Sequence, residues 1–391
     1  MILIVHQSLE LYGSDKSIID MANFLLSKTD SGVIFFLPEG NGLGLDYLRQ
    51  MQSRYGHRLR IYQLDVCKVD RSAFGLLGVA KLLRSIFFML FFVLRNRKEF
   101  AEVKFVHTNT VAVFGGVVVA SVLNVPHVWN VREIIERPKL ASVFLRLMVR
   151  CFSRLVISNS EATGSWVRIF GGGGKYFVVN NGVRPPEVSS GSFNRYRDNS
   201  KVMLGLVGRI SEWKGHMFLL DIVSELVSRG YKDFKVVVVG DAHSGNLEFL
   251  RNFKDKIQSL SLVEFVELIP FVDSVGDVYK SIDILLVPSL QPEPFGRVAV
   301  EAMSLGVPVV ASDAGGLQDI VKHGESGYLV EPADVEKFVV AIGILMADRS
   351  LRSSMGEMGS RRYLDRFTDE QCFLRYLEIF GEINEFNYIR D

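Results

Sequence analysis

Short apolar runs rich in β-branched residues alternate with helical patterns along both halves of the chain. The first half has candidate strands at residues 2–6, 33–37, 59–63, 105–107, 127–131, 155–158 and 176–179. The second half has them at residues 202–207, 235–239, 263–266, 284–287, 307–311 and 327–330. Buried strands separated by helices are typical of parallel sheets covered on both faces. The pattern therefore predicts an α/β protein built from two doubly wound sheets.

Helical patterns fill the intervals between these strands. The clearest cover residues 17–26, 76–94, 217–228, 247–259, 298–304 and 335–346. Near the middle, a glycine run at 171–174 precedes the proline- and serine-rich segment 185–192, which is typical of a linker. We therefore predict an N-terminal domain over residues 1–184, a linker over 185–200, a C-terminal domain over 201–367 and a last helical segment over 368–391.

Length and composition restrict the class of protein. A chain of 391 residues exceeds what one hydrophobic core usually holds. The net charge of +1 lacks the basic surplus that nucleic-acid binding requires. Cys67, Cys151 and Cys372 lie far apart without metal-ligand spacing, so they favour a reducing cytoplasm over a zinc site or a disulfide framework. Residues 1–5 are apolar but too short for a secretory signal, and they indicate a buried strand.

Two cations follow the strand at 202–207. Gly208 and Arg209 come directly after it, and Lys214 lies five residues further on. Arginine offers a planar set of donors and lysine a mobile point charge, and both suit a phosphate group. The carboxyl end of a strand is where doubly wound sheets bind ligands. The pattern therefore predicts a diphosphate site, although a solvated turn is the alternative.

Two carboxylates flank a bend in the same half. Glu293 and Glu301 lie on either side of Phe295 and Gly296, and a helical pattern follows the glycine. Carboxylates accept hydrogen bonds from hydroxyl groups, and glycine permits a close approach of the backbone to a ligand. Combined with the cations, they indicate a site for a nucleotide diphosphate-sugar. The alternative is that Glu293 is a loop acid and Glu301 an ordinary acid near a helix N-terminus.

The order Gly-Arg, Lys-Gly and then two glutamates eight positions apart resembles the retaining GT-B glycosyltransferases of family 4, the glycosyl transferases group 1, of the surface-polysaccharide type. The resemblance is strongest in the C-terminal half. It implies two Rossmann-like domains, of which the N-terminal one binds the acceptor and the C-terminal one the nucleotide-sugar, with the active site in the cleft between them. It also implies that the helix at 368–391 crosses back onto the N-terminal domain. It also implies that Arg209 and Lys214 bind the donor diphosphate, that Glu293 holds the donor sugar, and that Glu301 binds the ribose. The backbone of Phe295 and Gly296 would approach the sugar and phosphate.

The N-terminal half offers weaker site residues. Gly13 and Ser14 open a helix after the first strand, which suits an anion, although Ser14 or Asp15 capping that helix is the alternative. The resemblance implies a glycine loop beneath the donor phosphates here. Arg132 stands where many family members carry a histidine near the donor sugar, with an exposed ion pair to Glu133 as the alternative. His107 at a strand end is either a site residue or a structural histidine.

The expected reaction is transfer of a hexosyl group from a UDP- or GDP-linked donor to a sugar hydroxyl, with retention. The chain shows no Asp-x-Asp motif, and the two cations can neutralise the leaving group, so we expect no metal. As in the family, no enzymic nucleophile is evident, which favours a front-face mechanism. The alternatives are a GT-B-fold sugar-nucleotide epimerase or hydrolase, and a polysaccharide-binding module without catalysis.

One apolar stretch bears on location. Residues 85–94 are strongly apolar, but ten residues are too few for a bilayer that needs about 20. Basic residues bracket the stretch at Lys81, Arg84, Arg95, Arg97 and Lys98. It is either a buried helix with basic ends or a helix that docks on an anionic membrane. The second reading predicts a cytoplasmic enzyme, peripheral on the inner face of the membrane, with a lipid-linked acceptor in O-antigen, capsule or exopolysaccharide assembly.

Overall fold

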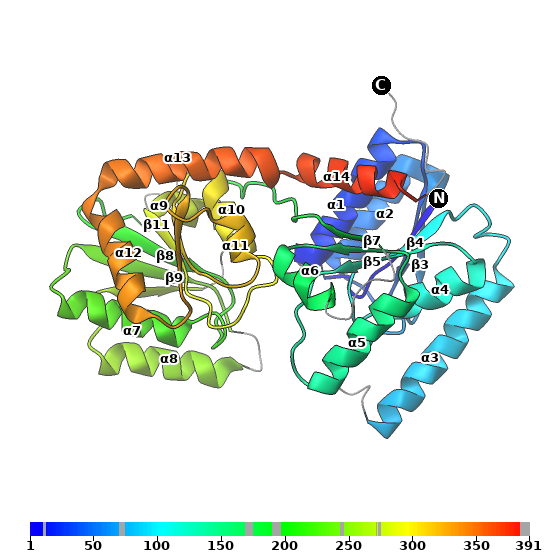
Figure 1. Ribbon diagram of the computed structural model, residues 1–391, viewed down its shortest axis with the longest axis horizontal. Helices are drawn as coiled ribbons and strands as arrows, with labels where there is room; N and C mark the ends of the chain where they lie inside the picture. Colours follow the sequence, from blue (N-terminus) through cyan, green and yellow to red (C-terminus); the bar gives the residue numbers. More distant parts are fainter. Residues whose placement is uncertain are drawn as a thin grey trace. The chain divides into compact units, whose positions relative to one another are not determined.

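The computed structural model describes residues 1–10, 13–69, 75–168, 175–189, 197–242, 246–270, 272 and 275–383 (Figure 1). The chain forms two compact units. Unit 1 contains Met1–Gly182 and Asp369–Asp391, and unit 2 contains Val183–Thr368. The glycine run at 171–174 and residues 190–196 of the predicted linker lie outside the described residues. Of the remaining linker, the backbone amide of Ser189 donates to the Asp277 carboxylate of unit 2 over 2.8 Å.

Unit 1 contains a seven-stranded parallel sheet in the order β3-β2-β1-β4-β5-β6-β7. Its strands are β1 (Ile2–Val5), β2 (Val33–Leu37), β3 (Leu59–Gln63), β4 (Phe105–Thr108), β5 (His127–Val131), β6 (Leu155–Ser158) and β7 (Lys175–Val178). Its helices are α1 (Gly13–Lys28), α2 (Leu43–Tyr55), the short η1 (Gly56–Arg58), α3 (Leu76–Arg95), α4 (Gly115–Leu123), α5 (Lys139–Phe152), α6 (Glu161–Arg168) and α14 (Asp369–Gly381).

Unit 2 contains a six-stranded parallel sheet in the order β10-β9-β8-β11-β12-β13. Its strands are β8 (Val202–Val207), β9 (Phe234–Val239), β10 (Val266–Ile269), β11 (Ile284–Val287), β12 (Val309–Ser312) and β13 (Gly327–Val330). Its helices are α7 (His216–Ser228), α8 (Leu247–Ser259), α9 (Val275–Ser281), α10 (Arg297–Ser304), α11 (Leu317–Ile320), α12 (Val335–Ala347) and α13 (Arg349–Arg366). The predicted fold class, two Rossmann-like doubly wound sheets, is confirmed.

The sheet of unit 1 is buried on both faces. One face packs against α1, α2 and α14, and the other packs against α3, α4, α5 and α6 (Figure 1). α14 is the last helix of the chain, yet it completes the first core. Its Phe380 is fully buried, with its ring centroid 4.8 Å from that of Phe105 on β4. Unit 1 therefore cannot bury its first face without the C-terminal helix.

Two sequence predictions need correction. The strand predicted at 263–266 is wrong, because β10 begins only at Val266. Ser261 has a φ of +57°, the amide of Leu262 donates back to Ile257, and Val263 is 63% exposed, so this segment is a turn after α8. The length argument on residues 85–94 is also wrong. α3 spans 20 residues, and residues 77–95 are long and apolar enough, by length and composition, to cross a membrane.

The packing of α14 leads to a stability prediction. Phe380→Ala should destabilise unit 1 by about 3–5 kcal/mol, since it removes a buried aromatic ring and leaves a cavity. Urea unfolding would be followed by tryptophan fluorescence in a Trp213→Phe background, where Trp129 and Trp166 report on unit 1 alone. Leu374→Ala, on an exposed position of the same helix, is the control and should stay within about 0.5 kcal/mol. Equal effects of the two substitutions would show that α14 does not complete this core.

Candidate functional site

Both sheets reverse their strand order beside their first strand. β1 lies between β2 and β4, and β8 lies between β9 and β11. Loops that leave the carboxyl ends of such neighbouring strands turn toward opposite faces of the sheet, which opens a crevice where ligands bind. The predicted site residues of unit 2 follow β8 and β11, and those of unit 1 follow β1 and β5. The topology therefore places the unit 2 residues, and Gly13 and Ser14 of unit 1, at the reversal point of their sheet, whereas Arg132 lies one strand further along, after β5.

In unit 2, the loop after β8 lies in close contact with the loop after β11. Gly208 directly follows β8, and its amide donates to the carbonyl of Val239 over 2.9 Å. Gly215 precedes α7 with a φ of +78°, and a Cβ there would lie 1.9 Å from the carbonyl oxygen of Pro288. Any side chain at Gly215 would drive the two loops apart. This close approach brings Lys214 next to the loop that carries Glu293.

Lys214 and Glu293 form a partly buried ion pair. The Lys214 ammonium lies 2.5 Å from Oε1 of Glu293, and the hydroxyl of Ser289 donates to the same oxygen over 2.8 Å. The two charged side chains are 16% and 6% exposed. The ammonium also lies 4.5 Å from the centre of the Trp213 ring, a cation–π arrangement. The sequence indicated both charges but not their contact, and no role was predicted for Ser289.

Two glycines after β12 fix the backbone of Glu293. The amide of Gly316 donates to the carbonyl of Glu293 over 2.7 Å. Gly315 has a φ of +64°, and a Cβ there would lie 2.2 Å from the same carbonyl oxygen. The backbone before α10 can therefore pass close to these two residues only because both lack side chains. Glu293 is thus held from three loops, which follow β8, β11 and β12.

The other predicted residues of unit 2 have different surroundings. Arg209 is exposed, and its guanidinium has no hydrogen-bond or ion-pair partner among the described residues. The side chain of Phe295 is buried in the core, and Gly296 is the residue before α10. Glu301 on α10 is 15% exposed and pairs with Arg297 over 2.7 Å. Glu301 therefore belongs to a second polar group rather than to the Lys214–Glu293 pair.

Tyr279 completes this second group. Its buried hydroxyl donates to Oε2 of Glu301 over 3.0 Å. Burial, together with the adjacent Glu301 charge, raises the pKa of Tyr279 well above its ordinary value. The tyrosine is therefore a neutral donor across the physiological pH range. Each oxygen of Glu301 has one protein donor and keeps a lone pair for a further hydroxyl.

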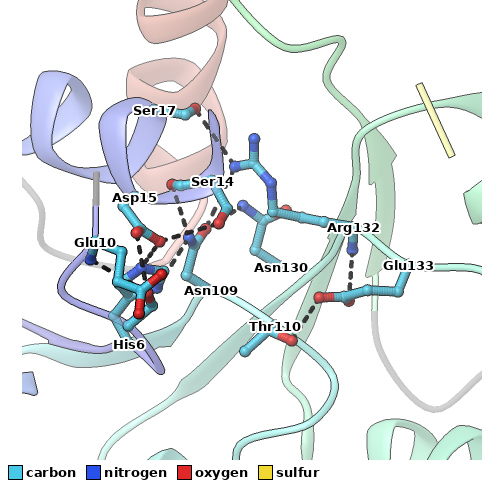
Figure 2. A network of polar contacts seen from close by, with 11 residues as sticks. His6, Glu10, Ser14, Asp15, Ser17, Asn109, Thr110, Asn130, Arg132 and Glu133 are labelled. Atoms are coloured by element: carbon cyan, nitrogen blue, oxygen red, sulfur yellow. Dashed lines mark hydrogen bonds and ion pairs between the residues drawn. The ribbon is translucent and has the colours of Figure 1, made fainter. Parts of the chain in front are cut away.

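In unit 1, a buried polar network surrounds Asp15 at the start of α1 (Figure 2). His6 Nε2 lies 2.7 Å from Oδ1 of Asp15, and both side chains are almost fully buried. The hydroxyls of Ser8 and Ser14 donate to Asp15 over 3.0 and 3.1 Å. Burial alone would raise the pKa of Asp15, but these hydrogen bonds outweigh it and the pKa is lowered. Gly13, the first residue of α1, is exposed.

Asn109 connects this network to Arg132. Its side-chain nitrogen lies 3.3 Å from His6 Nδ1, and its oxygen accepts from Arg132 over 3.4 Å (Figure 2). Arg132 also donates to Ser17 over 3.4 Å and to Asn181 over 2.7 Å. The structure therefore brings the predicted residues Ser14 and Arg132 together at the carboxyl edge of this sheet. The sequence analysis missed His6, because its only signal is a polar residue at the end of a strand.

Two alternatives for unit 1 are resolved. Among the described residues, Arg132 and Glu133 make no ion pair, because Glu133 accepts from the Thr110 hydroxyl over 2.5 Å instead. Burial raises the pKa of Glu133, although the Thr110 hydroxyl and the backbone amides of Val111 and Arg132 donate hydrogen bonds to its carboxylate. His107 is fully buried, with its ring centroid 5.9 Å from that of Phe380 on α14. Burial lowers its pKa to about 3, so His107 is an uncharged core residue.

A cavity of about 300 Å³ opens near the same edge of unit 1. It lies beside the carboxyl ends of β1, β2 and β3 and along the first half of α3. Its lining mixes carboxylates, ammonium groups, other polar groups and apolar side chains. The residues are Gln7, Pro38, Glu39, Asp65, Val66, Lys68, Gly78, Lys81, Leu82 and Ser85. Donors and acceptors around an apolar wall suit a ligand with many hydroxyl groups.

Solved structures share this fold along nearly the whole chain. The structure of Anabaena Alr3699/HepE in complex with UDP and glucose matches with a TM-score of 0.77 and 23% identity, covering 97% of this chain and 99% of that one. The lipopolysaccharide outer core galactosyltransferase WaaB, in its apo form, matches with a TM-score of 0.70 and 16% identity over 98% of this chain and all of that one. These likenesses establish the fold class, which is GT-B.

The family match lies within unit 2. Residues 192–362 match the family Glycosyl transferases group 1. The D-inositol 3-phosphate glycosyltransferase of Corynebacterium jeikeium is 39% identical over 159 residues, which cover 40% of this chain and 38% of that protein. The capsular polysaccharide biosynthesis glycosyltransferase CapM of Staphylococcus aureus is 31% identical over 172 residues, or 44% of each chain. The chain thus spans less than half of the length of these relatives.

The network around Asp15 leads to a pH-dependent prediction. The folded-state pKa of Asp15 is lowered, so its carboxylate stabilises the fold above the unfolded-state value of about 3.9. That contribution is lost as the pH falls through the folded-state pKa. Asp15→Asn should therefore cost about 1–3 kcal/mol at neutral pH, and the difference from the parent should shrink below about pH 4.

Urea unfolding at a series of pH values, in the Trp213→Phe background, measures this difference. Asp46→Asn is the control, because Asp46 is 65% exposed and lies 3.9 Å from Arg49. This control should stay within about 0.5 kcal/mol of the parent at every pH. A cost for Asp15→Asn that does not change with pH would contradict a role for the ionised carboxylate.

Proposed function

We propose that the protein is a retaining glycosyltransferase that moves a hexosyl group from a nucleotide diphosphate-sugar to a hydroxyl of a sugar acceptor. The Lys214–Glu293 pair carries this proposal. It lies at the reversal point of the sheet, in the part of the chain that matches the glycosyl transferases group 1. The likeness to HepE, whose structure holds UDP and glucose, supports a UDP-linked donor, and a GDP-linked donor is the other candidate.

The geometry supports distinct roles for the four charged residues. A diphosphate entering beside Arg209 competes with Glu293 for the Lys214 ammonium. Two cations then face the diphosphate, and Glu293 regains an oxygen that can accept from a sugar hydroxyl. Glu301 keeps free lone pairs for the ribose hydroxyls. The backbone at Phe295 and Gly296 passes between the two carboxylates. We therefore assign Arg209, Lys214 and Glu293 to catalysis and donor binding.

The proposed reaction proceeds on one face of the donor sugar. The bond between the anomeric carbon and the phosphate oxygen breaks, and the acceptor oxygen forms the new bond from the same side. The acceptor proton passes to the leaving phosphate oxygen. Arg209 and Lys214 stabilise the charge that develops on the leaving nucleoside diphosphate, and a preorganised cation is effective in that role. No residue of the chain is required as a nucleophile.

Unit 1 is the proposed acceptor domain. Gly13, Ser14 and Arg132 lie at the carboxyl edge of its sheet, and the cavity beside α3 has the mixed lining that hydroxyl groups require. The apolar α3 favours a lipid-linked acceptor and a location on the inner face of the cytoplasmic membrane. The likeness to CapM and WaaB supports surface-polysaccharide assembly as the setting.

Two other functions are weaker. A sugar-nucleotide epimerase or hydrolase of the same fold would bind the same donor, but it would cleave it without a sugar acceptor. A polysaccharide-binding module would not need the buried pair of Lys214 and Glu293, which is costly to maintain without a ligand. Release of nucleoside diphosphate only in the presence of an acceptor separates the proposal from both.

Donor binding should depend on the two cations. UDP or GDP should raise the melting temperature of the protein, because a ligand that binds only the folded state stabilises it. Arg209→Ala should abolish this increase and lower turnover by roughly 100-fold or more, which is typical for one preorganised electrostatic contact. Since Arg209 is exposed and has no partner among the described residues, this variant should melt like the parent.

Lys214→Ala should lower turnover to a similar extent, and its melting curve is recorded in parallel because it leaves Glu293 unpaired. Lys322→Ala is the matched control, since Lys322 pairs with Glu325 over 2.8 Å on the exposed surface of the same unit. It should leave turnover unchanged. Near-parental turnover of both site variants would overturn the assignment, and a parent that neither nucleotide stabilises would overturn the proposed function.

Transfer should also survive chelation. The proposal gives Arg209 and Lys214 the neutralising role that a divalent cation has in other enzymes. Turnover measured in excess EDTA should therefore equal turnover in untreated buffer. Loss of transfer in EDTA, followed by recovery when manganese is added, would contradict a metal-independent site.

A further inference from the structure

α3 exposes a broad apolar face. Its buried side points into the core of unit 1 through Ser85, Met89 and Val93. The opposite side carries large apolar residues at helical spacing, and Phe87 and Phe91 on it are 63% and 55% exposed. The full set is Leu77, Val79, Leu83, Phe87, Phe88, Leu90, Phe91 and Leu94. A helix on a sheet normally commits only its inner stripe to apolar residues. No part of the chain that the structure describes therefore covers the outer face of α3.

α5 repeats the arrangement. Its buried stripe contains Ala141, Leu145 and Val149. Its outer side carries Leu140, Val143, Phe144 and Leu147, and Leu140 is 84% exposed. Phe152, the last residue of the helix, is 45% exposed. The sequence analysis made no prediction for this helix. The structure shows that α5 has apolar residues on both faces.

The two outer faces point away from the same side of one sheet. Residues of α3 and α5 share one core cluster, which also contains α4, and Figure 1 shows all three helices on the side of unit 1 opposite α14. Side chains opposite the buried stripes point away from that sheet face. Among the described residues, every phenylalanine that is at least 40% exposed lies on α3 or α5. These residues are Phe87, Phe88, Phe91, Phe144 and Phe152. Scattered exposed apolar residues are normal, whereas a concentrated set marks an interaction surface.

The charge on this surface identifies its partner. The segments 76–98 and 139–154 contain only basic charged residues. These are Lys81, Arg84, Arg95, Arg97 and Lys98 on the first segment, and Lys139, Arg146, Arg150 and Arg154 on the second. Aromatic and aliphatic side chains flanked by cations, without a carboxylate, are the composition of a helix that lies in the interface of an anionic membrane.

We propose that α3 and α5 together form one membrane-docking surface, which binds anionic lipid with both helices parallel to the bilayer. The proposal deepens the membrane location proposed above, and it adds α5 as a second anchor. It does not require the donor site. Two helices restrict how unit 1 can tilt on a membrane more than a single helix does.

α3 is long enough to cross a bilayer, but its packing against the sheet and its connections to β3 and β4 are incompatible with a crossing. Met89 and Val93 are buried against the sheet. The helix also connects β3 to β4, two parallel strands of the same sheet. Crossing would remove these core contacts and separate the two strands. A helix that keeps its inner stripe on the sheet and inserts only its outer stripe satisfies both constraints.

Vesicle flotation tests the proposal. The full chain should float with vesicles of phosphatidylglycerol and phosphatidylcholine, and it should float less in high salt or with pure phosphatidylcholine. Phe87→Ser with Phe91→Ser should lower the vesicle-bound to free ratio at least roughly tenfold, and Leu140→Ser with Leu147→Ser should do the same. The control is Val340→Ser with Ile344→Ser, an exposed pair on α12 of unit 2 with the four-residue spacing of Phe87 and Phe91, and it should float like the parent.

The outcomes separate the alternatives. If the variant with both α5 substitutions floats like the parent, while the variant with both α3 substitutions does not float, then docking uses α3 alone and the proposal is overturned. If the parent stays at the bottom of both gradients, the surface does not bind lipid, and light scattering then shows whether a second copy of the chain covers it. Stabilisation by UDP or GDP is measured on every variant. It should be unchanged, so failure of membrane binding and failure of the proposed donor site are distinguishable.

Discussion

The reversal of strand order in each sheet is the constraint on which both candidate sites depend. A parallel sheet sends every connection over one of its faces, and the two directions of winding meet only beside β1 and β8. The connections that leave the neighbouring strands there turn toward opposite faces of the sheet, which opens a crevice at its edge. Polar side chains can therefore gather there without disturbing the cores. Lys214 with Glu293 in unit 2, and His6 with Asp15 in unit 1, occupy these positions.

The two pairs offset the free-energy cost of burying a charge in different ways. Asp15 is surrounded by His6 and two serine hydroxyls, so its charge is satisfied within unit 1. Such a carboxylate shapes a loop but has little capacity for a ligand. Lys214 relies on one carboxylate oxygen and an aromatic ring. Its other donor positions are available, so a stronger anion can recruit it. This difference is the physical reason for assigning the donor to unit 2 and a supporting role to the Asp15 network.

The sequence was sufficient for the fold because thirteen short apolar runs alternate with helical patterns, and most strands begin within two residues of the prediction. β10 was misplaced because Val263 is apolar but lies in a turn that the preceding helix C-terminus determines. The charged residues of unit 2 were found from their spacing. Their contact was not, because it depends on Gly215 and Gly315 bringing three loops together. The exposed face of α5 could not be inferred, since periodicity alone does not tell which of two apolar stripes meets the sheet.

The position of α14 has a consequence for the order in which the protein is made. Synthesis proceeds from the N-terminus, and domains usually fold in that order. Here the residues of unit 2 are complete at Thr368, whereas unit 1 still lacks the helix that begins at Asp369. The part of the first sheet that α14 covers, including Phe105, therefore stays exposed while the second unit folds, although α1 and α2 already cover the rest of that face. The first unit to emerge from the ribosome is the last to close its core, and a truncated chain would leave it open to aggregation.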